Sequence, residues 1–201
     1  MNTLKHRLPA LLLLAGMGFA SLAQATLIPR TVGADQMVYD SDLNLTWLKN
    51  ANTNGLMDWN TAMTWAANLV YGGKDDWRLP TADTVCGFAN NCTGSELGHL
   101  FYQELGVTSG NNITTGTPSE LAKFSNIQSL YYWTGTGFAP NTDLAWRFVT
   151  TGGAQGIDLK VNTMYGWAVR SGDVAAAVPE PGSLTLLAAS LAGWIGGRRR
   201  G

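Results

Sequence analysis

The chain has 201 residues, with 13 Lys and Arg, 14 Asp and Glu, and a formal net charge of −1. Charged residues make up only 13% of the chain, where about 25% is usual. This composition excludes disorder driven by charge and a nucleic-acid binder that works through a basic surface, and the length suits one globular domain.

Residues 1–25 have the pattern of a secretory signal peptide. Lys5 and Arg7 form a positive start, an apolar stretch runs to Leu22, and Ala23-Gln24-Ala25 supplies the small residues of a cleavage site. The apolar stretch is shorter than the roughly 20 residues that a membrane-spanning helix needs, which favours a signal peptide over an anchor. We therefore expect export and a mature domain over residues 26–174.

The mature domain begins with a predicted hairpin, in which strands at residues 36–39 and 43–48 flank a turn. The turn sequence Asp40-x-Asp42-x-Asn44 also imitates the start of a calcium-binding loop. A calcium loop has Gly at its sixth position and Glu at its twelfth, where this chain has Leu45 and Ala51, so the turn is favoured.

Two amphipathic helices are expected next. The first begins after Asp58, which is placed as its N-cap, and ends at Gly72-Gly73. The second begins at a capping box formed by Thr93 and Glu96 and ends at Gly106, and residues 106–118 are predicted to form a long surface loop. The buried stripe of the second helix consists of Leu97, Leu100, Phe101 and Leu105.

The last third of the domain has the alternation of strands. We expect four antiparallel strands, at residues 130–136, 144–150, 156–161 and 165–171. Most of the seven tryptophans in the domain are expected in the core, with Arg147 and Arg170 on the opposite face of their strands. Helices grouped apart from a sheet indicate an α+β fold.

The C-terminal residues 175–201 have the pattern of a second targeting segment. Pro179-Glu180-Pro181 precedes an apolar segment at residues 184–197, which is followed by Arg198, Arg199 and Arg200. The apolar segment is about 21 Å long as a helix, short of the roughly 30 Å hydrocarbon core, and three arginines resist transfer across a membrane. We expect this short transmembrane segment to be held briefly in the inner membrane and then removed, with a permanent membrane anchor as the alternative.

This layout resembles the PEP-CTERM sorting signal, which is also known as the C-terminal domain of ice-binding proteins. The resemblance implies an exosortase-type processing enzyme as partner and sorting to the cell surface or extracellular matrix of a Gram-negative bacterium that makes exopolysaccharide. Without the two targeting segments, the chain from residue 26 to 178 has eight basic and 13 acidic side chains, a net charge of −5. That charge disfavours DNA and anionic lipid as partners.

The string Asp76-Trp77-Arg78-Leu79-Pro80-Thr81, with Tyr132-Trp133-Thr134-Gly135-Thr136 and the closing Gly166-Trp167-Ala168-Val169-Arg170, resembles the Lcl C-terminal domain family. The likeness spans about residues 37–173 and implies a C-type lectin-like fold, with two helices and a twisted antiparallel sheet in a single domain. The family's usual pattern is Pro-Thr-x-x-Glu-Leu. In this chain an insert that contains Cys86 and Cys92 separates Pro80-Thr81 from Glu96-Leu97. Physically, Trp77 and Leu79 are expected in the core, and Arg78 is expected to pair with Asp75 or Asp76.

Cys86 and Cys92 enclose five residues in an exported chain, which predicts a local disulfide over a redox-active pair. His99, the one histidine of the mature chain, is expected to have a packing or surface role, and we predict no cofactor, no metal site and no catalytic residue. Aromatic rings stack on sugars, so the predicted ligand site lies around the loop at residues 137–143. Its residues are Tyr131, Asn141, Asp143, Arg147 and Arg170.

Two functions remain open from the sequence. The favoured one is a non-enzymatic surface or matrix protein that binds polysaccharide or builds the matrix. The alternative is an extracellular hydrolase or oxidase acting on matrix polymer, which predicts two carboxylates that converge in a cleft with a raised pKa.

Overall fold

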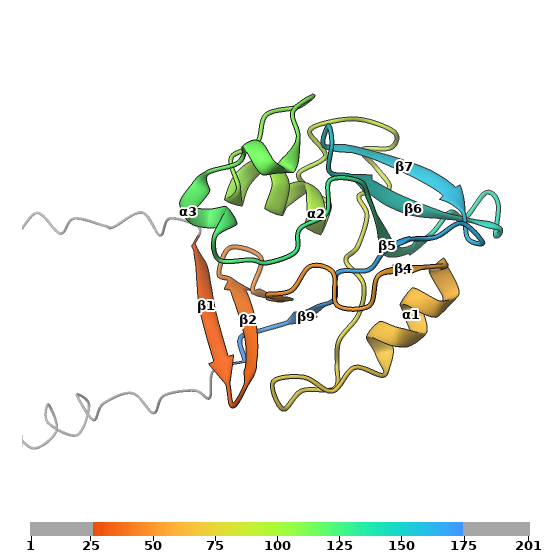
Figure 1. The fold of residues 1–201 in the computed structure, drawn as a ribbon. Coiled ribbons are helices and arrows are strands. Elements are labelled where there is room, and N and C mark those ends of the chain that lie inside the picture. The colour runs from red at the N-terminus through yellow and green to blue at the C-terminus, as the bar shows by residue number, and fades with distance from the viewer. Residues whose placement is uncertain (1–25, 175–201) are drawn as a thin grey trace, which may run out of the picture.

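The computed structural model describes residues 26–174, in which two sheets pack with short helices around a shared core (Figure 1). The predicted signal peptide, the Pro179-Glu180-Pro181 motif and the predicted membrane segment at 184–197 lie outside the described residues. Within residues 26–174, no helix is long and apolar enough to cross a membrane.

The first sheet has four antiparallel strands in the order β1-β2-β3-β9. Strands β2 (Asp35–Asp40) and β3 (Leu45–Leu48) form the hairpin that the sequence predicts. Strand β1 (Leu27–Val32) was not predicted; it pairs with β2 along its whole length and forms one edge of the sheet. The other edge is β9 (Val169–Ser171), so the described chain begins and ends in the same sheet.

The second sheet has five strands in the order β4-β8-β5-β6-β7. Strands β5 (Tyr131–Gly137), β6 (Leu144–Val149) and β7 (Ala154–Leu159) follow the predicted antiparallel pattern. The predicted fourth strand at 165–171 is wrong as a single element. Its start, β8 (Met164–Tyr165), pairs in parallel with β5 and antiparallel with β4 (Leu56–Met57), whereas its end forms β9 in the other sheet.

Helix α1 (Trp59–Ala67) begins as expected, because the Asp58 carboxylate accepts a hydrogen bond from the Thr61 backbone N–H at 3.0 Å. Its predicted end at Gly72-Gly73 is wrong. The helix stops at Ala67, and the two glycines, both at positive φ, instead lie in a tight turn closed by reciprocal backbone hydrogen bonds between Tyr71 and Lys74.

The second predicted helix consists of α2 (Glu96–His99) and a π-helical turn, η1 (Leu100–Glu104). The Thr93 capping box is wrong: the Ser95 hydroxyl caps the helix by accepting from the Gly98 N–H at 3.0 Å, and Glu96 has another partner. The predicted stripe is buried, and Gly106 ends the segment at a φ of +66°. The expected loop at residues 106–118 contains one short helix, η2 (Ile113–Thr115), and ends where α3 (Pro118–Leu121) begins.

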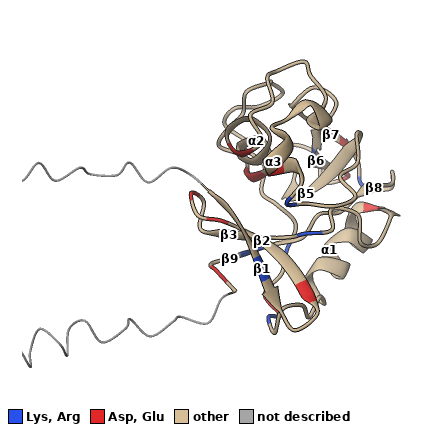
Figure 2. Ribbon diagram, turned by 60° about the vertical axis from the view of Figure 1, so that its left-hand side comes forward, with Lys and Arg blue, Asp and Glu red and all other residues tan. Residues whose placement is uncertain are grey.

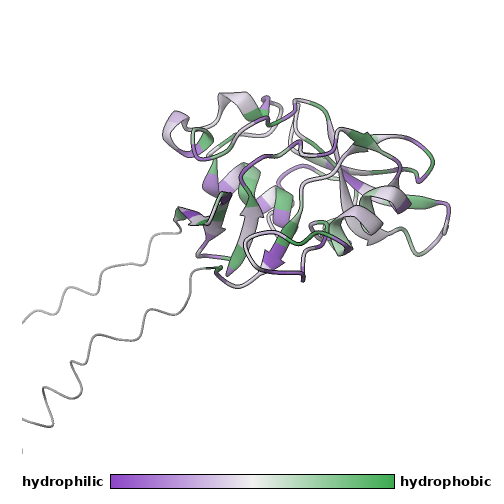
Figure 3. Cartoon of the chain, turned by 60° about the horizontal axis from the view of Figure 1, so that its bottom comes forward, coloured by the Kyte–Doolittle hydropathy of each residue, from purple (hydrophilic) through white to green (hydrophobic). Residues whose placement is uncertain are grey.

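One hydrophobic core joins the two sheets. Five of the seven tryptophans in the described residues are buried, as expected for most of them, and hydrophobic residues recur along both sheets (Figure 3). Trp167, between β8 and β9, packs edge to face on Trp47 of the first sheet at 5.2 Å between ring centroids and contacts Tyr132 of the second at 5.7 Å. The result is a single domain with more sheet than helix, in agreement with the coarse α+β prediction.

Candidate functional site

The segment Asp76–Thr81 is a scaffold that connects the two sheets to helix α2. Trp77 and Leu79 are buried as predicted, and Arg78 exchanges two backbone hydrogen bonds of 2.8 Å with Val169 of β9. The expected pairing of Arg78 with Asp75 or Asp76 is wrong. Asp76 instead accepts two hydrogen bonds from Arg170, at 2.6 and 2.9 Å, and this pairing holds the pKa of the Asp76 carboxyl below its usual range.

Arg78 points toward the N-terminus of α2. Its guanidinium donates two hydrogen bonds to the Glu96 carboxylate, at 2.8 and 2.6 Å, which raise the pKa of the guanidinium. The same carboxylate accepts the Thr81 backbone N–H at 2.7 Å. Thr81 and Glu96 therefore meet although the insert separates them in sequence, which means that the insert is looped out and the contact is kept.

Two of the predicted ligand residues come together on the second sheet. The Arg147 guanidinium lies 4.3 Å from the centre of the Tyr131 ring and is paired with the Asp158 carboxylate at 3.2 Å. The partly exposed Tyr131 ring also lines an apolar hollow of about 200 Å³. This hollow, called here the Tyr131 hollow, is lined by Leu56, Leu130, Tyr131, Thr163, Met164 and Tyr165.

The other three predicted ligand residues are not part of the Tyr131 hollow. Asn141 accepts the Asp143 backbone N–H at 3.0 Å and thus shapes the loop between β5 and β6. Asp143 lines a different hollow, beside Asn60 and Lys160. Arg170 lies in β9 of the other sheet, where its guanidinium is bound to Asp76, so the sequence prediction grouped residues that the fold separates.

Cys86 and Cys92 form the predicted disulfide, with their Cα atoms 5.7 Å apart. The loop that they close places Phe88 on the second sheet, where its ring stacks on Trp146 at 5.0 Å between centroids. Phe88 is still 62% exposed, so the loop adds an aromatic surface to the sheet. The disulfide thus closes the loop that carries Phe88.

Lys and Arg positions are spread over several elements (Figure 2). Each arginine of the described part pairs with a carboxylate, and these pairs do not form a basic face. The pairs are Arg30–Asp173, Arg78–Glu96, Arg147–Asp158 and Arg170–Asp76.

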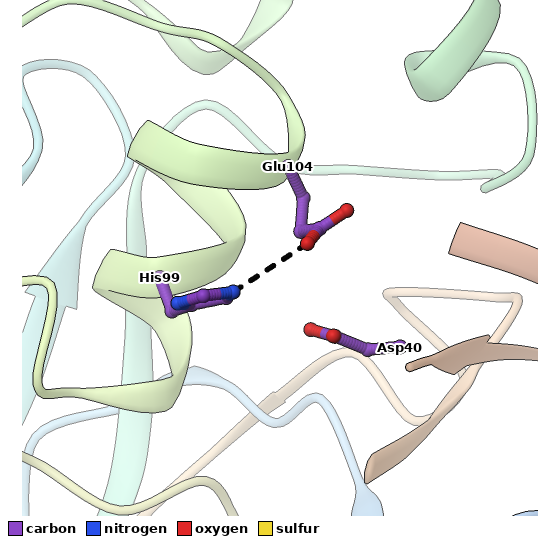
Figure 4. A group of neighbouring side chains, drawn as sticks. All are labelled: Asp40, His99 and Glu104. Atoms are coloured by element: carbon purple, nitrogen blue, oxygen red, sulfur yellow. Dashed lines mark ion pairs between the residues drawn. The ribbon is translucent and has the colours of Figure 1, made fainter. Parts of the chain in front are cut away.

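A cluster that the sequence did not predict brings Asp40, at the end of β2, to His99 of α2 and Glu104 of η1 (Figure 4). One ligand atom from each lies within 4.8 Å of the other two. His99 Nε2 is 3.5 Å from Glu104 Oε1 and 3.2 Å from Oδ2 of Asp42, which lies at the exposed rim. We call these four residues the Asp40 cluster.

Burial dominates the electrostatics of this cluster. Asp40 is fully buried, and the Glu104 side chain is only 3% exposed. Desolvation raises the pKa of the Asp40 carboxyl, and desolvation together with the charge of Asp40 raises the pKa of the Glu104 carboxyl. The sequence predicts a turn at Asp40 and a packing or surface role for His99, but no sequence pattern singles out Glu104.

Comparisons with known proteins give two matches to family models. The model of the Lcl C-terminal domain matches residues 36–170, which is more than half of the chain. The model of the PEP-CTERM protein-sorting motif matches residues 177–200, which include the Pro179-Glu180-Pro181 motif. Neither a curated protein nor a solved structure matches the chain.

Proposed function

Because the chain belongs to the Lcl C-terminal domain family and carries a PEP-CTERM sorting motif, we propose that it is a non-catalytic binding protein that recognises polysaccharide. The sorting motif supports processing by an exosortase-type enzyme and localisation at the cell surface or outside the cell. A protein displayed there is surrounded by the polymers of the matrix, which makes them the first candidates for its ligand.

The fold that we propose within the α+β class is C-type lectin-like. Its support is the combination of an N-terminal hairpin, two helical segments and a second, mainly antiparallel sheet, with the first and last strands in one sheet. The Arg30 side chain donates two hydrogen bonds to Asp173 Oδ2, at 3.1 and 2.6 Å, and so ties β1 to the end of the domain.

The Tyr131 hollow is the observation that carries the ligand proposal. The C–H faces of a sugar ring pack on aromatic rings, and its hydroxyl groups need hydrogen-bonding groups at the edge of the contact. The hollow offers the rings of Tyr131 and Tyr165 and the side chain of Thr163, with the Arg147–Asp158 pair beside it. The pair neutralises the Arg147 charge, which favours a neutral sugar over a sulfated one.

The alternative, a hydrolase, needs two carboxylates with a raised pKa that a polymer can reach. Asp40 and Glu104 have the raised pKa, but Asp40 is fully buried and Glu104 nearly so. Carboxylates this deeply buried are out of reach of a polymer chain, and their burial supports the non-catalytic proposal.

The test uses the processed protein recovered from the producing cells, mixed with their own matrix polysaccharide and with a glycan array. Tyr131→Ala removes one ring of the hollow, and we expect binding about fivefold weaker, since an aromatic contact contributes about 1 kcal/mol. Val85→Ala is the matched control, because Val85 is a fully exposed apolar residue outside the hollow. Failure to bind any glycan, the native polysaccharide included, would leave a purely structural matrix component.

A further inference from the structure

We propose that the Asp40 cluster is a binding site for a divalent transition-metal ion of the zinc type. Asp40, His99 and Glu104 supply the buried ligands, and Asp42 completes the set from the exposed rim. This site is separate from the Tyr131 hollow and does not depend on polysaccharide binding.

Each buried member directs an unsatisfied atom into the cluster. Asp40 Oδ2, His99 Nε2 and Glu104 Oε1 are buried and form no hydrogen bond of good geometry, although His99 Nε2 lies at ion-pair distance from Glu104 Oε1 and Asp42 Oδ2. The two carboxylate oxygens of Asp40 have different surroundings. The other oxygen, Oδ1, accepts hydrogen bonds from the backbone N–H groups of Asp42 and Leu43 at 3.0 and 3.1 Å. One oxygen thus forms the turn, while the other faces the cluster. Buried polar atoms rarely lack a well-aligned hydrogen bond, so three in one place are where a bound ion would complete the contacts.

Two distances in the cluster match the spacing of ligand atoms around a metal ion, and the three buried ligand atoms lie within 4.8 Å of one another. Ligand atoms at the usual zinc bond lengths lie about 3.4 Å apart around a tetrahedral ion. His99 Nε2 is 3.5 Å from the nearest Glu104 oxygen and 3.2 Å from the nearest Asp42 oxygen. The three side chains shown in Figure 4 point into one common space.

The π-helical turn is what brings His99 and Glu104 together. In a regular α-helix, residues five apart are about 140° apart around the axis and face different directions. Here the Leu105 N–H bonds to the Leu100 carbonyl, five residues earlier, at 2.9 Å. This wider turn rotates Glu104 back toward His99. π-Helical turns are rare within α-helices, and they are found frequently at functional sites.

The charges of the cluster also favour a bound cation. Three carboxylates surround one imidazole, and among the described residues no Lys or Arg forms an ion pair with any of them. Buried carboxylates are costly unless they are paired, protonated or bound to a metal. A divalent ion would offset this cost.

The ligand types select the kind of ion. Calcium and magnesium prefer oxygen ligands only, whereas an imidazole nitrogen together with carboxylates suits zinc. With four protein ligands the site would be closed, as structural zinc sites are. It would join the end of β2 to the α2–η1 segment, which are more than fifty residues apart in sequence.

The test uses the processed protein, purified without a histidine tag and stripped with a chelator, then titrated with Zn²⁺, Mn²⁺, Ca²⁺ and Mg²⁺ alone. We expect one Zn²⁺ per chain, a higher midpoint of thermal unfolding and a shift of the imidazole signals in a nuclear magnetic resonance spectrum of ¹⁵N-histidine-labelled protein. Because the mature chain has a single histidine, those signals report on His99 alone.

Glu104→Gln keeps the shape of the side chain but weakens metal binding, and we expect a loss of at least about tenfold, since even outer partners of metal sites have effects of this size. Glu120→Gln, a change of the same kind in α3, is the control and should bind like the wild type. The proposal is overturned if the wild type binds no Zn²⁺, if Zn²⁺ leaves the His99 signals unchanged, or if Ca²⁺ binds more tightly. Should the Glu104 variant not fold, the spectrum of the wild type decides.

Discussion

Arg78 and Glu96 are joined by two charge-assisted hydrogen bonds, and this pair connects the most specific motif of the chain to its second helix. The contact spans the insert that contains the disulfide. It holds the motif against the helix although the insert separates them in sequence. Arginine suits position 78 because its planar guanidinium can bind both carboxylate oxygens at once.

We predict that Glu96→Gln lowers the free energy of unfolding by about 2 kcal/mol, because Arg78 loses a charged acceptor and the Thr81 N–H keeps a weaker one. Urea unfolding followed by tryptophan fluorescence measures the change. Lys123→Ala, which removes the i,i+3 pair with Glu120, should cost no more than about 0.5 kcal/mol. Equal effects of the two variants would show that the Arg78 pair is no more than an ordinary surface contact.

Gly98 is required where the chain turns into α2. A Cβ atom at this position would overlap the carbonyl oxygen of Cys92 and the hydroxyl of the cap residue Ser95. We expect Gly98→Ala to lower the free energy of unfolding by about 3 kcal/mol, the upper end of the usual cost of overpacking. Gly152→Ala is the control, since nothing lies within 4 Å of its Cβ position. A neutral Gly98 variant would mean that the Cys92 loop can move away.

Acid should weaken the link between Asp76 and Arg170. The pKa of Asp76 is lowered in the folded state, so the unfolded state binds the proton first and stability falls as the pH drops below about 4. Because Asp76 is half exposed, we expect this contribution to be only about 1 kcal/mol. Asp76→Asn should lose it at pH 7 and show a shallower decline than the wild type between pH 5 and 2. Parallel pH profiles for the two proteins would contradict the assignment.

The sequence predicted the parts of the fold that depend on neighbours in the chain. The β2–β3 hairpin, the Asp58 cap and the short disulfide are examples, because the interacting residues lie within a few positions of each other. The pairing of strand β9 with β3 could not be predicted in this way, since β3 lies more than a hundred residues earlier and periodicity does not show which strand pairs with which.

The same limit applies to the candidate sites. Tyr131 and Arg147 are in contact, because adjacent antiparallel strands place them on one face. Arg170 was grouped wrongly, as its strand changes sheets. The Asp40 cluster depends on two features that no local pattern contains: the approach of Asp40 to His99 in the fold, and the π-helical turn at residues 100–104.

The most direct test of the account as a whole is mass spectrometry of the protein recovered from the cell surface or the medium. Export and exosortase processing predict an N-terminus at about Thr26 and a C-terminus near Pro179, without the three terminal arginines. A recovered chain that still contains Arg198, Arg199 and Arg200 would contradict this account and indicate a protein that keeps its C-terminal segment.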